Sequence, residues 1–192
     1  MKSRISKSLF ILFLLLPLVV SCGKDAVDAV HPTGCDACVG AACINDGGSW
    51  PAEWVALEDE VLTRVNDIRA AGASCAGDHF GPVPALTMNI ALRQSARCHS
   101  LDMGTQNYFT HNSKDGRSPW TRMANAGYQG YPTAENIAAG YGDAHSVTNG
   151  WMASPGHCHN IMLSTSTEIG IGFAFSPQSD YHDYWTQDFG RR

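Results

Sequence analysis

The sequence predicts an α+β fold in which helices come first along the chain and an antiparallel pair of strands comes last. In the segments 53–71 and 90–103, apolar residues recur every three or four positions, which is the spacing of amphipathic helices. After Thr167 the pattern changes to short runs rich in Ile, Phe, Tyr and Trp, which are typical of strands. This order indicates helices packed on a small sheet.

The clearest helix covers Glu53–Ala71, and Gly72 is a plausible stop for it. A second helix begins after Thr87 or Asn89, because either residue can cap a helix N-terminus. Its apolar stripe includes His99, and a lone histidine on such a face is usually a core residue with a hydrogen-bond partner. The stripes consist of Leu57, Val61, Val65 and Ile68 in the first helix and Leu92, Ala96, His99 and Met103 in the second.

The segment from Gly104 to Gly142 is rich in Gly, Asn, Ser and Pro, and we expect one short helix in it, at Pro119–Ala126. Asp143 can cap a further helix, which should end near the Ser-Pro-Gly sequence at 154–156 because a Pro-Gly pair favours a turn. Two strands then follow, at Glu168–Phe175 and Tyr184–Phe189, joined by the connection SPQSD.

The N-terminus has the features of an export signal. Three basic residues precede the apolar run Leu9–Val20, which is shorter than the roughly 20 residues that a membrane-spanning helix needs. The run ends in Val-Val-Ser-Cys, which resembles the bacterial lipobox, where the signal (here residues 1–21) is removed and the cysteine (here Cys22) receives lipid. The alternative is an ordinary signal peptide with a chance cysteine. We therefore expect an outer-membrane or cell-surface lipoprotein, and otherwise a periplasmic or secreted protein.

Removal of residues 1–21 leaves an acidic chain. The whole sequence has 13 Lys+Arg and 18 Asp+Glu, and the signal holds three of the basic residues and none of the acidic ones, so 10 basic residues face 18 acidic ones. No basic patch for nucleic acid is present, and the membrane contact would come from the lipid. Residues 22–52 have few large apolar side chains and predict a cysteine-containing tether, followed by one domain at 53–192.

Seven cysteines are an odd number, and lipidation of Cys22 leaves six. An exported protein meets an oxidising compartment, so we expect disulfides. The Cys35-x-x-Cys38 pair could instead hold zinc or act as a redox motif, but no second such pair follows and no βαβ pattern surrounds it. Structural bridges are therefore favoured, among fifteen connectivities that six cysteines allow. The six are Cys35, Cys38, Cys43, Cys75, Cys98 and Cys158.

Four segments together resemble the CAP superfamily of cysteine-rich secretory, antigen five and pathogenesis-related proteins, also called the sperm-coating-protein-like extracellular domain. They are NYFTH ending at His111, AENIAAG from Ala134, GWMASPGHCHNIM from Gly150, and TEIGIGFAF with the later YWTQDFG. The segment SPGH-x-x-NIM after a tryptophan-bearing helix is similar to the bacterial branch. The resemblance implies a three-layer α-β-α sandwich of the CAP type.

In that family, two histidines and two acidic residues line an open cleft. Position by position, the resemblance implies that His111, Glu135 and His157 are the cleft residues that bind a ligand. The second acidic residue belongs near the end of the tryptophan-bearing helix, but Trp151 is followed by Met-Ala-Ser, so it has no counterpart. Glu168 is a candidate to compensate for it.

The resemblance also suggests a disulfide. Bacterial relatives carry one cysteine after the first helix and another in the SPGH segment, which favours a Cys75–Cys158 bridge here. Cys158 stands beside His159 and could act as a nucleophile, but the oxidising compartment favours the disulfide. Cys98 would then pair with one of the tether cysteines, Cys35, Cys38 or Cys43.

Two imidazoles and a carboxylate in a cleft can bind a divalent metal, act as acid and base, or form a network that only holds loops. Zinc would suit His111 and His157, although no His-Glu-x-x-His motif is present. Family members hold sterols, lipids, glycans or protein partners, and no general catalytic activity is established for them. We therefore expect a binding module, with a metal-dependent or acid–base hydrolase and a structural envelope lipoprotein as alternatives.

Overall fold

The computed structural model describes residues 50–192. The predicted signal peptide, the lipidation site Cys22 and nearly all of the predicted tether lie outside the described residues and stay predictions. Within the described part of the chain, no helix is both long enough and apolar enough to span a bilayer.

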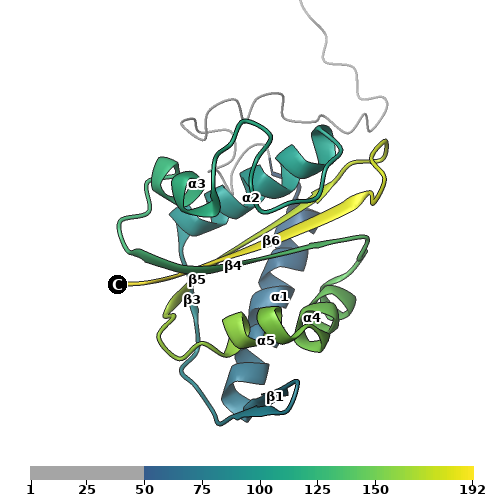
Figure 1. The fold of residues 1–192 in the computed structure, drawn as a ribbon. Coiled ribbons are helices and arrows are strands. Elements are labelled where there is room, and N and C mark those ends of the chain that lie inside the picture. Colours follow the sequence, from purple (N-terminus) through teal and green to yellow (C-terminus); the bar gives the residue numbers. More distant parts are fainter. Residues whose placement is uncertain (1–49) are drawn as a thin grey trace, which may run out of the picture. The chain divides into compact units, whose positions relative to one another are not determined.

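A four-stranded sheet forms the middle layer, with the strands in the order β3-β5-β6-β4 (Figure 1). Strand β6 pairs antiparallel with both β5 and β4, whereas the short β3 runs parallel to β5. Strands β4 and β6 pair over almost their whole length, in a register that places Glu135 directly opposite Asp188. The strands are β3 (Thr87–Met88), β4 (Tyr131–Ala139), β5 (Glu168–Phe175) and β6 (Asp183–Arg191).

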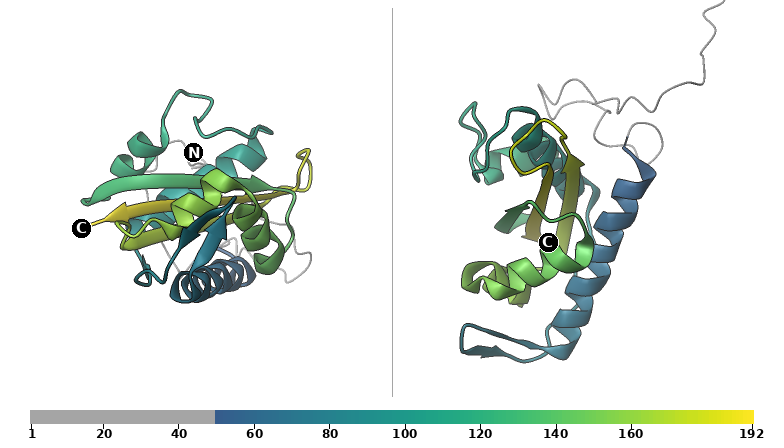
Figure 2. Two further views of the ribbon diagram at one scale, coloured as in Figure 1. Left: turned by 60° about the horizontal axis from the view of Figure 1, so that its bottom comes forward. Right: turned by 90° about the vertical axis from the view of Figure 1, so that its right-hand side faces the viewer.

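Helices cover both faces of this sheet. On one face lie α2 (Ile90–Thr105) and α3 (Pro119–Asn125), and on the other lie α1 (Ala52–Ala71), α4 (Ala144–Ala153) and α5 (Pro155–Met162) (Figures 1 and 2). A small hairpin of β1 (Ala73–Cys75) and β2 (Asp78–Phe80) follows α1. This arrangement is the predicted three-layer α-β-α sandwich. Its main core lies between the sheet and the α1, α4 and α5 layer.

Helix caps explain why several helices begin where the sequence predicts. The Asn89 side chain accepts hydrogen bonds from the backbone N–H groups of Ala91 and Leu92, and Asp143 accepts one from Ser146. At Ser154 the predicted turn is only one residue long. Ser154 ends α4 and precedes the first residue of α5, where a proline is tolerated because its missing N–H needs no partner there. A helix therefore carries the SPGHCHNIM segment.

Strand β4 corrects the prediction that 104–142 contains only one short helix. Five consecutive residues, Ala134–Ala138, are buried, so both faces of this strand are covered and no alternation of apolar and polar residues marks it. Its composition, with Pro132, Asn136 and several alanines, also has low strand propensity. Pairing with β6 imposes the extended conformation.

Trp50, which lies in the predicted tether, packs on the folded domain. Its ring is 6% exposed, packs against Trp54 at a centroid distance of 5.2 Å, and donates from Nε1 to Glu58 Oε1 at 3.0 Å. Cys98 is also buried, on α2, but its predicted partners lie outside the described residues, so that pairing stays a prediction.

The predicted Cys75–Cys158 disulfide is confirmed, with the two Cα atoms 5.6 Å apart. It joins the end of β1 to α5 across a sequence separation of 83 residues. Both residues are fully buried in the main core. The bridge therefore fixes the helix that carries His157 to the hairpin that follows α1.

Reduction of this disulfide is expected to lower the free energy of unfolding by about 2–4 kcal/mol, because it restores conformational freedom to the unfolded chain. Urea denaturation of the Cys75→Ala/Cys158→Ala double variant, read by circular dichroism, measures this loss. A double variant as stable as the oxidised parent would contradict a stabilising role. His157 resonances that move in the variant would show that the bridge also positions the site.

Candidate cleft residues and family

The predicted cleft residues His111 and Glu135 are in direct contact. His111 lies in the segment after α2 and Glu135 lies on β4, and His111 Nδ1 is 2.8 Å from Glu135 Oε1. The Glu135 side chain is 2% exposed, whereas that of His111 is 52% exposed. Because Nδ1 is engaged, Nε2 is the ring nitrogen of His111 that can meet a ligand. The carboxylate thus orients the exposed imidazole.

Arg122 on α3 completes this arrangement. Its Nη2 atom donates to Glu135 Oε2, and its Nη1 atom donates to the carbonyl oxygen of His111 at 2.8 Å. The guanidinium is almost fully buried. Burial alone would raise the pKa of Glu135, but the hydrogen bond with His111 and the positive charge of Arg122 hold it below its usual value. Glu135 is therefore an ionised carboxylate with both oxygens engaged.

Asp188 is an acidic residue beside Glu135 that the family resemblance does not mark as a cleft residue. It is fully buried on β6, and burial together with the negative charge of Glu135 raises its pKa well above the usual range. The pKa values of the two facing carboxyl groups are thus shifted in opposite directions. An aspartate within the apolar run YWTQDFG was the available signal.

Glu168 does not take the place of the missing cleft acid. Its carboxylate accepts hydrogen bonds from Asn89 Nδ2 at 3.0 Å and from the Tyr128 hydroxyl at 2.8 Å, and it pairs with Arg192. Glu168 itself lies at the start of β5, and Arg192 follows the end of β6. Glu168 is therefore occupied away from the two cleft histidines.

His157 lies on α5, half-buried, on the wall of a cavity of about 300 Å³. The Asn136 side chain donates to its carbonyl oxygen at 3.2 Å, which ties α5 to β4. Burial and then the positive charge of His111 lower the pKa of His157, so the ring is neutral near pH 7. His111 and Glu135 are not part of the cavity wall. The wall comprises Phe109, Ile137, Ala138, Ala139, Tyr141, Gly150, Trp151, Ser154 and His157.

The residues present do not fit a zinc site with three protein ligands. Among residues 50–192, no three His, Cys, Asp or Glu side chains are grouped closely enough to hold a metal ion. Both oxygens of Glu135 are already bound, one by His111 and one by Arg122. His111 and His157 are thus the remaining donors, and two protein ligands are fewer than zinc sites normally use.

His99 is a core histidine, as its place on the apolar face of α2 predicts. It is fully buried, and its Nε2 atom lies 3.0 Å from the carbonyl oxygen of Thr110. Since a carbonyl oxygen can only accept, the neutral ring carries its proton on Nε2. Burial, and then the positive charge of Arg122, lower the pKa of His99 from 6.5 to about 4.

This shift predicts loss of stability in acid. The pKa of His99 is lower in the folded state than in the unfolded state, so its contribution is complete above pH 6.5 and declines as the pH falls towards 4, by about 3 kcal/mol. Urea denaturation between pH 7 and pH 4 should show this decline in the parent and a shallower one in His99→Gln. The exposed His79→Gln control should behave like the parent. Identical slopes for all three proteins would contradict the assignment.

Comparisons with known proteins agree with this fold and these motifs. A model of the cysteine-rich secretory protein family, CAP, matches residues 62–189. The uncharacterized protein YkwD of Bacillus subtilis (strain 168) is 38% identical over 104 residues, which are 54% of this chain and 38% of YkwD. The uncharacterized membrane protein YlbC of the same organism is 34% identical over 94 residues, which are 49% of this chain and 25% of YlbC. The matched stretches thus span well under half of either curated relative.

Solved structures share the fold at low sequence identity. An outer surface protein from Borrelia burgdorferi aligns with a TM-score of 0.58 and 20% identity, over 70% of this chain and 91% of that one. An extracellular protein containing an SCP domain from Bacillus anthracis aligns with a TM-score of 0.57 and 24% identity, over 77% and 45%. With a family model that matches most of its length, this chain belongs to the cysteine-rich secretory protein (CAP) family, and bacterial proteins are among its relatives.

Proposed function

We propose that this protein is an exported CAP-domain lipoprotein, anchored at Cys22, whose cleft binds a lipid, glycan or protein ligand. The observation that supports this function most directly is the cavity beside His157. Its wall is mostly apolar and aromatic, and its polar groups are the hydroxyls of Ser154 and Tyr141 and the neutral His157 ring. An apolar wall with a few polar groups is the usual composition of a binding pocket. The outer-surface and extracellular relatives fit an exported protein.

Phe109 is suited to testing this cavity. It lines the wall, and because it is 39% exposed it is accessible to a ligand. Phe175 is also 39% exposed and does not line the cavity, so it is a matched control. We expect Phe109→Ser to weaken palmitate binding about tenfold, since burying a phenylalanine ring stabilises by about 1.5–3 kcal/mol, and Phe175→Ser to leave binding unchanged.

Displacement of a fluorescent fatty acid from the full chain carrying Cys22→Ser measures this affinity without the attached lipid. Equal losses in both phenylalanine variants, or no saturable binding of palmitate or of soluble oligosaccharides by the parent, would contradict a binding cavity at this place. The anchor is tested in the same preparation, because Cys22→Ser should move the protein out of the membrane fraction.

The alternative is a hydrolase that uses His111, Glu135 and His157. One observation favours it: a buried carboxylate orients the exposed His111 ring, as in many metal and acid–base sites. Zinc titration of the parent, His111→Ala and His157→Ala tests the metal-dependent form of this hydrolase. Stoichiometric zinc that both variants lose would support the hydrolase, whereas no zinc binding by three equally stable proteins would support a metal-free binding surface.

A further inference from the structure

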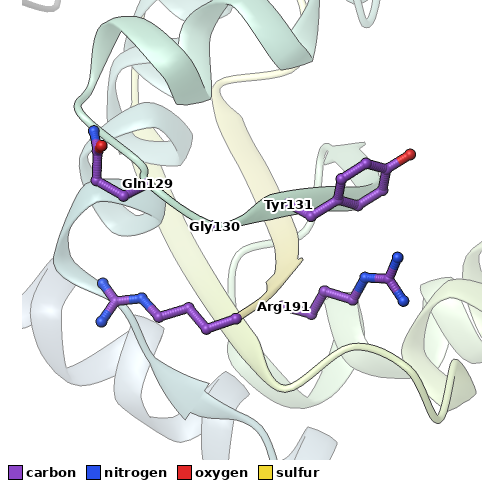
Figure 3. A pocket seen from close by; sticks show the side chains of 5 residues that line it. Gln129, Gly130, Tyr131 and Arg191 are labelled. Atoms are coloured by element: carbon purple, nitrogen blue, oxygen red, sulfur yellow. The ribbon is translucent and has the colours of Figure 1, made fainter.

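A second hollow, of about 620 Å³, lies at the opposite end of β4 from the cleft cavity. It is lined by Gln129, Gly130, Tyr131, Arg191 and Arg192, and Figure 3 shows Gln129 and Tyr131 leaving the chain on either side of Gly130. Tyr131 begins β4, whereas the cleft cavity reaches Ala139 at its end. Six residues of extended strand separate Tyr131 from Ile137, the nearest β4 residue of the cavity wall, a distance of about 20 Å. The two sites are therefore distinct.

Arg191 differs from every other arginine among residues 50–192. Each of the others has a carboxylate or a carbonyl oxygen as an acceptor, and Arg191 has neither. Its guanidinium carbon instead lies 4.8 Å from the centre of the Tyr131 ring, which is 64% exposed. The paired arginines are Arg64, Arg93, Arg97, Arg117, Arg122 and Arg192 with carboxylates and Arg69 with carbonyl oxygens.

The Tyr131 ring holds the Arg191 guanidinium by a cation–π contact and leaves its N–H donors unused. A guanidinium presents five N–H donors in a planar fork, and oxyanions accept them in pairs. Because Arg191 has no acceptor among residues 50–192, an external anion can bind without breaking an ion pair within this part of the chain. The chain as a whole is acidic, with 18 Asp+Glu against 13 Lys+Arg, so the attraction must be local.

The surroundings of Arg191 are rigidly built. A Cβ atom at either Gly130 or Gly190 would overlap the Tyr128 hydroxyl, so both glycines allow this buried ring to lie under the hollow. The Tyr128 hydroxyl donates to Glu168, which also pairs with Arg192 at 3.4 Å. Arg192 is therefore held at the rim with most of its side chain exposed, and it adds a second positive charge.

We propose that this hollow binds a phosphate group attached to a sugar or polyol. Arg191 donates to the phosphate oxygens, Arg192 adds electrostatic attraction, and the exposed Tyr131 ring and the Gln129 amide contact the carbon skeleton. A phosphate offers several oxygens and can therefore accept from Arg191 and a second donor at once. The volume exceeds that of a bare ion and suits such a ligand. A phospholipid head group and a phosphorylated glycan both carry this chemistry.

Amide and arginine NMR signals of the full chain carrying Cys22→Ser, titrated with inorganic phosphate, test the site. We expect saturable shifts at Gly130, Tyr131 and the Arg191 side chain, and an affinity at least tenfold weaker in Arg191→Gln. The control is Arg64→Gln, which removes one positive charge from an exposed pair with Glu60 on α1 and should bind like the parent. Equal weakening in both variants, or no saturation, would overturn the proposal.

Further titrations distinguish the two sources. Tighter binding of glucose 6-phosphate than of a short-chain phosphatidylglycerol below its micelle concentration identifies a glycan phosphate, and the reverse order identifies a lipid head group. In either case Tyr131→Leu should weaken the organic phosphate more than inorganic phosphate. Gluconate that binds as tightly as glucose 6-phosphate would overturn the assignment to phosphate.

Discussion

Replacing Gly170 with alanine is expected to lower the free energy of unfolding by at least about 4 kcal/mol, because helix α2 lies directly on this strand residue. A Cβ atom at Gly170 would overlap the backbone of Leu92 and Arg93, and one at Gly172 would overlap the backbone of Ala96 and Arg97. Backbone atoms of a helix cannot rotate away as a flexible side chain can. The helix would have to move away from β5 as a whole.

Gly156→Ala is the matched control for this substitution. Gly156 lies in α5 at a backbone angle open to all residues, and a Cβ atom there would meet nothing within 4 Å. Alanine is the better helix former, so this variant should be as stable as the parent or up to about 1 kcal/mol more stable. Thermal and urea unfolding followed by circular dichroism compare the two. A Gly170→Ala protein within about 1 kcal/mol of the parent would contradict the close approach of α2 to β5.

The same glycines show which parts of the fold the sequence can predict. The amphipathic stripe of α2 and its cap at Asn89 are local signals, and both predict the helix correctly. The two glycines in Gly170-Ile-Gly172 are not a local signal. They are required because the backbone of α2 packs directly on them. Strand β4 has no local signal for a related reason, since it is buried on both faces and its pairing with β6 determines its conformation. Local patterns thus predict elements that are amphipathic, and tertiary contacts determine the others.

The candidate site shows the same division. The family resemblance pointed to His111 and Glu135, and the structure places them 2.8 Å apart. Arg122 lies in none of the four motifs, and Asp188 lies in YWTQDFG without being marked there as a site residue, because the importance of both depends on burial beside Glu135. A charged side chain in the interior must be paired, so Glu135 requires a partner such as Arg122, but the sequence does not say which arginine it is. Three-dimensional contacts were needed to identify both residues.

Glu58→Gln is expected to cost about 3–5 kcal/mol of stability, although the change replaces one oxygen by an NH₂ group. Glu58 on α1 is fully buried, and its carboxylate accepts from Arg97 Nε at 3.0 Å. It also accepts from Trp50 Nε1 at 3.0 Å and from the backbone N–H of Phe173 at 3.1 Å. One carboxylate therefore joins the start of the domain, α2 and β5.

An amide at this position removes the negative charge and leaves the guanidinium of Arg97, which is 1% exposed, without that ion pair. The cost arises from the buried positive charge left behind, and it exceeds the value of one hydrogen bond. Glu60→Gln is the control, because Glu60 lies on the same helix in an exposed pair with Arg64 and should contribute less than about 1 kcal/mol.

A double variant separates the lost charge from the lost packing. If the uncompensated Arg97 charge causes the loss, Glu58→Met/Arg97→Met should be more stable than Glu58→Gln alone, because it removes both buried charges and keeps the volume apolar. Urea unfolding of the parent, the double variant and its single substitutions measures this coupling. A double variant that loses as much as the sum of its single substitutions would show that Glu58 acts through its separate bonds to Trp50 and Phe173, and the ion pair would then have no special role in joining α1 to α2.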